Sequence, residues 1–342
     1  MALLRIVTLL SLSGLCHSQP LCSYGRLWNF LNLTTSNSYL LNFRPVKNWT
    51  DQTEVKVEMI IYGILKVSWK NDFIEWNPKD FCNIGVFSVP SSKVWIPDLD
   101  IQEDASDSSS IQQSPFVNLY QDGWASTTAR QLLTFTCQLD LNMYPFDRQQ
   151  CNVTFSPMTS SVAAILLTSD GNGTQITNTS KSVIITEGEW ELKNIRIHTD
   201  FRRNFDNETY SELIYTVNLT RRPMLYVINF IVPLLYFLIL DLASFFINEA
   251  RGEKLSFKVT ILLSISVLLL ILKDMLPSTE RHMPWIAKYC VGIFALVGVS
   301  VLEAMAISFL LSFPEKVKKD SAHRRICEDE TQLERTDSKG TI

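Results

Sequence analysis

A row of polar, aliphatic and acidic side chains between positions 253 and 274 has the composition of an ion pathway. Counted along a helix from Ser256, the residues at i+4, i+7, i+11, i+14 and i+18 share one face within about 40°, and Glu253 lies about 60° from that line. The row consists of Glu253, Ser256, Thr260, Leu263, Val267, Leu270 and Asp274. In a pore, carboxylates at both mouths would concentrate cations, hydroxyls would replace hydration water, and the aliphatic residues would gate by dewetting. The alternative is an ordinary membrane-spanning helix whose acidic ends face the lipid head groups.

The rest of the chain offers no set of residues suited to catalysis. The four histidines are scattered, without the spacing of a nucleophile–base pair or a metal site. The GNGT segment at Gly171 is too short for a phosphate-binding loop and carries a glycosylation sequon. The net charge is −4, and the sequence has no basic patch interleaved with aromatic residues, as a nucleic-acid-binding surface would have. We therefore expect no enzyme activity, no cofactor, no metal ion and no nucleic-acid partner.

Three long apolar runs predict an all-α transmembrane domain over residues 224–313. Each run is long enough to cross a bilayer as a helix, and the helices are expected at 224–246, 253–275 and 285–313. Lys258 lies close enough to the end of the second helix to snorkel to the surface. We expect Asp241 to face water and Glu303 to make an interhelix hydrogen bond.

The flanking segments indicate the orientation of these helices. Residues 1–18 read as a cleaved secretory signal, with Arg5 before a short apolar core and small residues at its end. Basic residues precede the second helix and follow the third, which places both on the cytoplasmic side. The predicted topology has an extracellular N-terminus and a short, charged cytoplasmic tail over residues 314–342.

Residues 19–223 predict an all-β extracellular sandwich. Short runs rich in β-branched and aromatic residues alternate with turn-forming clusters. Strands are expected at 55–67, 86–89, 131–137, 151–155, 182–186, 189–197 and 212–220. Trp69, Trp76 and Trp95 are expected in the core.

Sequons for N-glycosylation agree with an extracellular location, because all of them precede Met224. The predicted acceptors are Asn32, Asn48, Asn152, Asn172, Asn178 and Asn207. A seventh sequon, at Asn218, lies close to the membrane.

Four cysteines fall in the predicted extracellular domain, and an even number in an oxidising compartment indicates two disulfides. Cys137 and Cys151 enclose thirteen residues, and we expect a disulfide across neighbouring strands rather than a metal site, because no second cysteine pair has ligand spacing. The remaining pair would be Cys22–Cys82. The first disulfide would hold the segment Tyr144–Asp147 as a stiff apolar tip.

Several motifs together resemble the Cys-loop pentameric ligand-gated ion channels, and within them the serotonin type 3 receptor subunits. The motifs are the thirteen-residue cysteine loop with YPFD, GEWEL at Gly188, RRPMLYVINFIVP at Arg221 and GEKLSFKVTILL at Gly252. The resemblance covers nearly everything from about Phe43 to Phe313. It implies five homologous subunits in a homo- or hetero-pentamer around one pore, in the plasma membrane, with a small cationic agonist bound between extracellular domains.

The resemblance also assigns roles to individual residues. Glu253, without a proline inserted before it, resembles the cation-selective branch, and Leu263 matches the gating ring. The implied ligand-binding residues are Gln102, Glu103, Met158, Trp190 and Tyr210. The implied coupling residues are Tyr144, Pro145, Phe146 and Asp147, with Arg222 as the expected partner of Asp147.

Three departures from the family pattern bear on function. In the family, a turn and a second strand follow a strand of this kind. Here Trp69 comes only two residues after Val67, so one turn and one strand are expected to be missing. The binding tryptophan after the cysteine loop is Met158, and a tyrosine of the complementary face is Thr128. A long cytoplasmic segment and a fourth membrane helix are not found in this sequence.

These departures leave two functions to consider. The first is a subunit of a cation-selective, neurotransmitter-gated channel. The alternative is a truncated, non-conducting or regulatory subunit that modulates the assembly of full-length partners or is retained in the endoplasmic reticulum.

Overall fold

The structure is a computed structural model that describes residues 23–33, 38–61, 63–105, 111, 114–130, 132–183, 188–247, 253–275 and 283–310. The predicted signal and cytoplasmic tail lie outside these residues. The chain divides into two compact units. The first contains residues 1–138, 150–188 and 192–219, and the second contains 139–149, 189–191 and 220–342.

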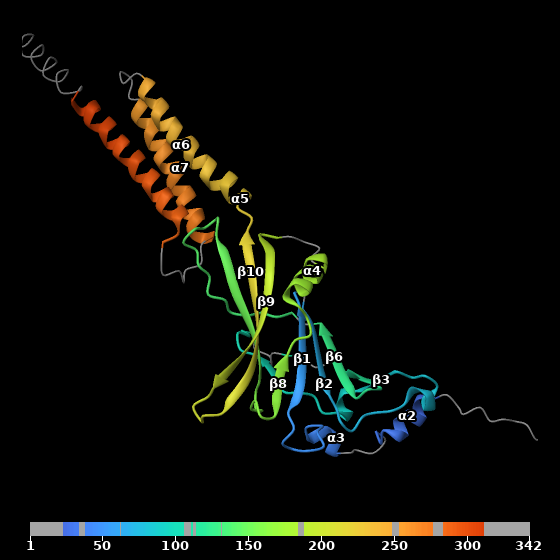
Figure 1. Ribbon diagram of the computed structural model, residues 1–342. Helices are drawn as coiled ribbons and strands as arrows, with labels where there is room; N and C mark the ends of the chain where they lie inside the picture. Colours follow the sequence, from blue (N-terminus) through green and yellow to red (C-terminus); the bar gives the residue numbers. More distant parts are fainter. Residues whose placement is uncertain are drawn as a thin grey trace, which may run out of the picture. The chain divides into compact units, whose positions relative to one another are not determined.

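Two β-sheets form the first unit, which confirms the all-β prediction (Figure 1). The larger sheet has the strand order β3-β5-β6-β2-β1-β8 and the smaller one β4-β7-β10-β9. The larger contains β1 (Thr53–Ile60), β2 (Ile64–Lys70), β3 (Val86–Pro90), β5 (Phe116–Tyr120), β6 (Trp124–Arg130) and β8 (Ile165–Thr168). The smaller contains β4 (Leu99–Ile101), β7 (Arg148–Pro157), β9 (Trp190–Arg203) and β10 (Thr209–Arg221).

The core of the first unit lies between the two sheets. Residues along β1 alternate between buried and less buried positions, as expected for a strand with one face in the core. Trp69 and Trp76 are buried and Trp95 packs against the same cluster, which confirms the predicted core tryptophans. The hydroxyl of buried Tyr215 on β10 donates a hydrogen bond to the Val57 carbonyl on β1 at 2.6 Å. Burial raises the pKa of this phenol to about 12.

The segment 55–67, predicted as one strand, is a hairpin. β1 and β2 pair antiparallel, with Val55 opposite Trp69 and Ile60 opposite Ile64. Gly63 adopts a φ of 76°, the left-handed conformation that tight hairpins require. The strand expected to be missing is therefore present as β2, and the hairpin turns within the apolar run itself. The run contains no proline, asparagine or aspartate to mark that turn, so its apolar pattern was misleading.

Two further strand predictions are wrong. Residues 132–137 form no strand and make only an isolated bridge, between Phe135 and Asp104. Ser182 and Val183 belong to a helix, α4 (Gly173–Val183), and 184–186 lie outside the described residues. The helix buries Ile176, whose neighbours are polar, so its single apolar stripe is too sparse to predict. The sequence analysis also missed β4, β5, β6 and β8, the short helices α2 (Tyr24–Phe30) and α3 (Ser38–Asn42), and the 3₁₀ turns η1 (Pro78–Phe81) and η2 (Ser91–Lys93).

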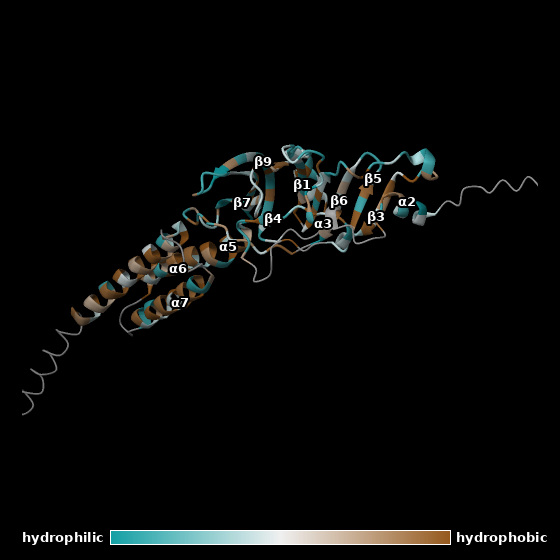
Figure 2. Cartoon of the chain, turned by 90° about the horizontal axis from the view of Figure 1, so that it is seen from below, coloured by the Kyte–Doolittle hydropathy of each residue, from teal (hydrophilic) through white to brown (hydrophobic). Residues whose placement is uncertain are grey.

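Three helices of the second unit are long and apolar enough to cross a membrane. The first spans Met224–Phe246 and comprises α5 (Met224–Tyr226), η3 (Val227–Ile231), α6 (Val232–Ala243) and η4 (Ser244–Phe246). The second is α7 (Glu253–Met275), and the third is described over Trp285–Leu310. The π-helical turn η3 ends two residues before Pro233, a residue that cannot donate a backbone hydrogen bond to the helix. Figure 2 shows hydrophobic residues dominating α6 and α7, in contrast to the mixed colouring of the strands.

One of the two predicted disulfides lies within the described residues. Cys137 and Cys151 are bonded, with their Cα atoms 5.5 Å apart, which confirms that prediction. Cys82 is also disulfide-bonded, and its partner lies outside the described residues, as does Cys22.

We expect peptide mapping without reduction to recover a fragment that links Cys22 to Cys82. Two ectodomain cysteines remain once Cys137 and Cys151 are paired, and the secretory route is oxidising. The measurement is mass spectrometry of alkylated, unreduced digests of the purified chain. Alkylated Cys22 would contradict the pairing.

Candidate functional site

All seven residues of the row from Glu253 to Asp274 are exposed on one face of α7. Among the aliphatic members, Leu263, Val267 and Leu270 are 65%, 52% and 61% exposed. The opposite face is buried against the helix's own unit, through Ile261, Ile265 and Leu272 among others. In a single chain, therefore, no described element of the second unit covers the predicted pore face.

One of the two hydroxyl groups on this face, that of Thr260, is held in a defined orientation. Thr260 donates its hydroxyl proton to the carbonyl of Ser256, one turn earlier, at 2.9 Å. This is the usual bond of a mid-helix threonine to the preceding turn. Because the proton points back along the helix, the oxygen lone pairs remain available on the exposed face and can replace part of the hydration shell of a passing cation.

The buried face of α7 carries a charge that the sequence analysis placed at the surface. Lys258 is 1% exposed, and its ammonium lies 3.0 Å from a carboxylate oxygen of Asp241 on α6. Ser300 of the third helix donates a hydrogen bond to the same oxygen at 3.1 Å and also contacts Lys258. The predictions of a snorkelling Lys258 and a water-facing Asp241 are therefore wrong. Glu303 is exposed and makes no hydrogen bond to another helix among the described residues, whereas Ser300 does make one, to Asp241.

A second buried ion pair lies in the cysteine loop. Arg221, at the end of β10, binds Asp147 through two contacts, Nε to Oδ1 at 2.8 Å and Nη2 to Oδ2 at 3.3 Å. Its third nitrogen bonds Glu189 at 3.0 Å. Burial disfavours the charged guanidinium, but the hydrogen bond and charge of Asp147 outweigh this, and the pKa of Arg221 is raised. Gln149 donates a further hydrogen bond to Asp147 at 2.6 Å.

The prediction that Arg222 pairs with Asp147 is wrong by one position, because the partner is Arg221. Successive side chains of a strand point to opposite faces, and here Arg221 is buried while Arg222 is exposed. The Arg222 backbone N–H instead bonds the Glu189 carbonyl at 2.8 Å.

Aromatic rings enclose the Arg221 guanidinium. Its central carbon lies 4.1 Å from the centroid of Trp190, 4.8 Å from that of Tyr144 and 5.6 Å from that of Tyr226. Such faces attract a cation through the ring quadrupole. Trp190, which the resemblance implied as a ligand contact, thus has its ring occupied by a residue of its own unit.

The tip of the cysteine loop packs against the membrane helices within the second unit. Tyr144 and Leu141 are buried with Tyr226 and Phe230 of the first span, and burial raises the pKa of Tyr144. The Asn142 carbonyl accepts the backbone N–H of Trp285, the first residue of the third helix, at 2.9 Å. Phe146 is half exposed, whereas Pro145 and Asp147 are buried. The loop is therefore joined to two of the three helices by packing and hydrogen bonds.

The other implied ligand residues lie in the first unit, with differing surroundings. Glu103 accepts hydrogen bonds from the backbone N–H and the hydroxyl of Thr154, both at 2.7 Å. Gln102 donates to Glu212 at 2.6 Å. Met158 is 66% exposed and Tyr210 is partly buried.

Glu212 joins a network that the sequence analysis did not identify. Its carboxylate accepts from Gln102 and also pairs with Arg202 at 2.8 Å. Arg202 and Glu212 stand on the neighbouring strands β9 and β10, a relation that only the sheet pairing reveals.

The six predicted glycosylation acceptors are all exposed: Asn32, Asn48, Asn152, Asn172, Asn178 and Asn207. Asn218 is less accessible, and its amide donates to Asn194 at 2.7 Å. Within the residues that the structure describes, no group of three or more His, Cys, Asp or Glu side chains could hold a metal ion.

Comparison with known proteins identifies two matching family profiles. The neurotransmitter-gated ion-channel ligand binding domain matches residues 29–223, and the neurotransmitter-gated ion-channel transmembrane region matches residues 230–337. The boundary between them coincides with the start of the first membrane helix.

Curated relatives agree with these profiles. The 5-hydroxytryptamine receptor 3A of Cavia porcellus is 32% identical over 79% of this chain and 58% of its own length. The human 5-hydroxytryptamine receptor 3E is 31% identical over 79% of this chain and 61% of its own length. The neuronal acetylcholine receptor subunit alpha-3 of Carassius auratus is 28% identical over 76% and 53%, respectively.

The chain thus spans about 53–61% of the length of these relatives. They are receptors rather than enzymes, in agreement with the expectation that this chain has no enzyme activity. From the two profiles and the arrangement of sandwich, cysteine loop and membrane helices, the chain belongs to the neurotransmitter-gated ion-channel family.

Proposed function

We propose that the chain is a subunit of a cation-selective, pentameric channel that a small cationic agonist opens. The observation that carries this proposal is the exposed face of α7, where acidic, hydroxyl and aliphatic residues occur in the order suited to a pore. Five copies arranged around an axis would cover this face and form rings of like residues. The partners are then homologous subunits and the surrounding membrane lipid.

The proposed location is the plasma membrane, with the first unit outside the cell. The exposed glycosylation acceptors in the first unit and the bonded cysteines both support this orientation. The basic residues between the first two helices then face the cytoplasm.

Two buried ion pairs suggest how agonist binding would reach the pore. Asp147 and Arg221 hold the cysteine loop to the start of the first span, and Lys258 holds the pore helix to its neighbours. A displacement of the cysteine loop would be passed to the first and third helices through Tyr226 and Trp285. The pore helix would follow through the Lys258–Asp241 pair.

Replacing Glu253 with alanine is expected to reduce cation selectivity. The change would remove five carboxylates from one mouth of the pore, where they would concentrate cations. In patch-clamp recordings under a salt gradient, the reversal potential should move toward zero. Asp274→Ala should have a smaller effect because Lys273 lies beside Asp274. An unchanged reversal potential for Glu253→Ala would argue against the pore assignment.

A second candidate is a non-conducting or regulatory subunit. Met158 stands where the family has an aromatic residue, and the Trp190 ring is covered by Arg221, so the proposed agonist site has few free aromatic faces. The same recordings separate the two functions. Agonist-gated current from the chain alone supports the channel, whereas reduced current from a full-length partner expressed with it supports the regulatory subunit.

Serotonin is expected to bind this chain weakly, and Met158→Trp should strengthen binding. The substitution adds one aromatic face, and a cation–π contact contributes about 0.5–2 kcal/mol, or about 2- to 30-fold in affinity. Radioligand displacement on purified protein measures the change. Met143→Trp is the matched control, because Met143 is similarly exposed (63%) but lies in the second unit. Equal affinity in the Met158→Trp variant and the unaltered chain would contradict the assignment.

A further inference from the structure

An apolar hollow of about 550 Å³ lies at one end of the first unit. It falls within the range of cavities that bind small organic ligands, about 300–1,000 Å³. Apart from Gly63 and Arg130, every described residue that lines it is hydrophobic. It is distinct from the residues considered above for agonist binding.

The early turn of the β1–β2 hairpin accounts for this hollow. β2 pairs with β6 from Lys70 opposite Trp124 to Ile64 opposite Arg130, and there the pairing ends, because β2 begins at Ile64. Beyond Arg130, residues 132–137 form no strand, and among the described residues they pair only through the bridge between Phe135 and Asp104 and its flanking hydrogen bonds. Leu133 and Phe135 consequently line an open space instead of a continuous sheet.

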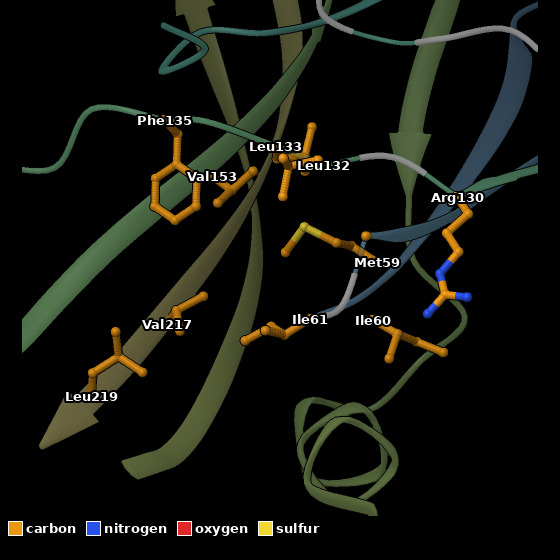
Figure 3. A pocket seen from close by; sticks show the side chains of 11 residues that line it. Met59, Ile60, Ile61, Arg130, Leu132, Leu133, Phe135, Val153, Val217 and Leu219 are labelled. Carbon is orange, nitrogen blue, oxygen red and sulfur yellow. The ribbon is translucent and has the colours of Figure 1, made fainter. Parts of the chain in front are cut away.

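The floor and walls of the hollow are well defined. Val153 on β7 and Val217 on β10 are buried, as is Met59 at the end of β1. Phe135 is 38% exposed, so the hollow is open to solvent beside it. Figure 3 shows Met59 near the centre, with Phe135, Val153 and Val217 to one side of it. Exposed apolar surface of this kind in a folded domain is commonly a binding surface.

Arg130 carries the one positive charge among the described residues that line the hollow. Figure 3 places the Arg130 side chain across Met59 from Phe135 and Val217. The lining contains no acidic residue, and the Arg130 guanidinium makes no hydrogen bond or ion pair within the part of the chain that the structure describes. A guanidinium binds a carboxylate through two parallel hydrogen bonds. The charge therefore favours an anionic group at this end, with the apolar body of the same molecule in the hollow.

We propose that this hollow binds small anionic amphiphiles, with a carboxylate on Arg130 and an aromatic or aliphatic body over Met59, Val153 and Val217. A cationic ligand would meet Arg130 without an acidic partner. A sugar would leave its hydroxyls without hydrogen-bonding side chains on the hydrophobic walls. The proposal does not depend on conduction, because it concerns binding to the first unit alone.

The test uses the full chain in lipid nanodiscs and two probes of the same shape, naphthalene-2-acetate and its neutral amide. Saturation-transfer NMR measures binding, with empty nanodiscs subtracted. A Kd of about 1 mM or tighter is expected for an anion of this size. Arg130→Gln should weaken binding of the acetate about two- to fivefold and leave binding of the amide unchanged, as expected for the loss of one exposed ionic contact.

Three further variants make the outcome specific. Val153→Trp fills the floor and should abolish binding of both probes, with its melting temperature recorded to show that it folds. Arg130→Glu should exclude the acetate and admit 2-(naphthalen-2-yl)ethylammonium. Arg196→Gln, an exposed arginine of β9 outside the hollow, should change nothing. The proposal is overturned if the unaltered chain binds no acetate, or if Arg130→Gln and Arg130→Glu bind it as tightly as the unaltered chain.

Discussion

Replacing Asp241 with alanine is expected to destabilise the membrane domain by about 3–5 kcal/mol, because it leaves the Lys258 ammonium buried without its counter-ion. Lys258 is 1% exposed, and its bonds go to Asp241 on α6 and Ser300 on the third helix. The serine hydroxyl cannot neutralise the charge. Insertion scales assign a similar cost, about 3 kcal/mol, to an unpaired charge at the centre of a membrane helix.

Thermal or denaturant melts of the detergent-purified chain measure its free energy of unfolding. Asp241→Leu combined with Lys258→Met should recover most of the loss, since replacing a whole buried ion pair by apolar residues is often neutral or stabilising. Glu303→Ala is the matched control, because it removes an exposed carboxylate from the third helix. Its free energy of unfolding should stay within about 0.5 kcal/mol of that of the unaltered chain. A melting curve for Asp241→Ala that matches that of Glu303→Ala would show that the ion pair contributes nothing.

Arg221→Gln is expected to have an effect of similar size in the cysteine loop, about 3–5 kcal/mol, because Asp147 would remain buried without a cation. Asp147 is 2% exposed, and only Gln149 would still donate to its carboxylate from a side chain among the described residues. Arg221→Lys should fall between Gln and the native residue. A lysine keeps the charge but cannot reproduce the two parallel contacts with Asp147 or stack as a plane against Trp190.

Arg222→Gln supplies the control, because it changes the same residue type at the next position, on the exposed face. It should shift stability by less than about 1 kcal/mol. Melts of the purified variants rank them by their free energy of unfolding. The resistance of the cysteine loop to proteolysis reports the stability of the loop itself. If Arg222→Gln is as damaging as Arg221→Gln, the assignment of Arg221 as the partner of Asp147 is wrong.

Features that depend on local pattern could be predicted from the sequence. The spans at 224–246 and 253–275 follow from apolar length, and the pore face of α7 follows from helical periodicity, which is a property of the helix alone. The Cys137–Cys151 pair follows from cysteine spacing in a secreted domain. The two-sheet class follows from strand composition, although short strands such as β8, of four residues, carried too little pattern to be found.

Only the tertiary structure decided which charges are buried and which neighbours they meet. Arg221 and Arg222 are the same residue type, and the phase of β10 against the core decides which of them is buried beside Asp147. Lys258 has a side chain long enough to snorkel, but a carboxylate on another helix, seventeen positions earlier, lies 3.0 Å from its ammonium. The same holds for the hollow beside Arg130, which lies where β2 begins at Ile64 and its pairing with β6 ends. Periodicity assigns residues to faces of one element, whereas the partners of a buried charge or an open cavity depend on elements distant in the chain.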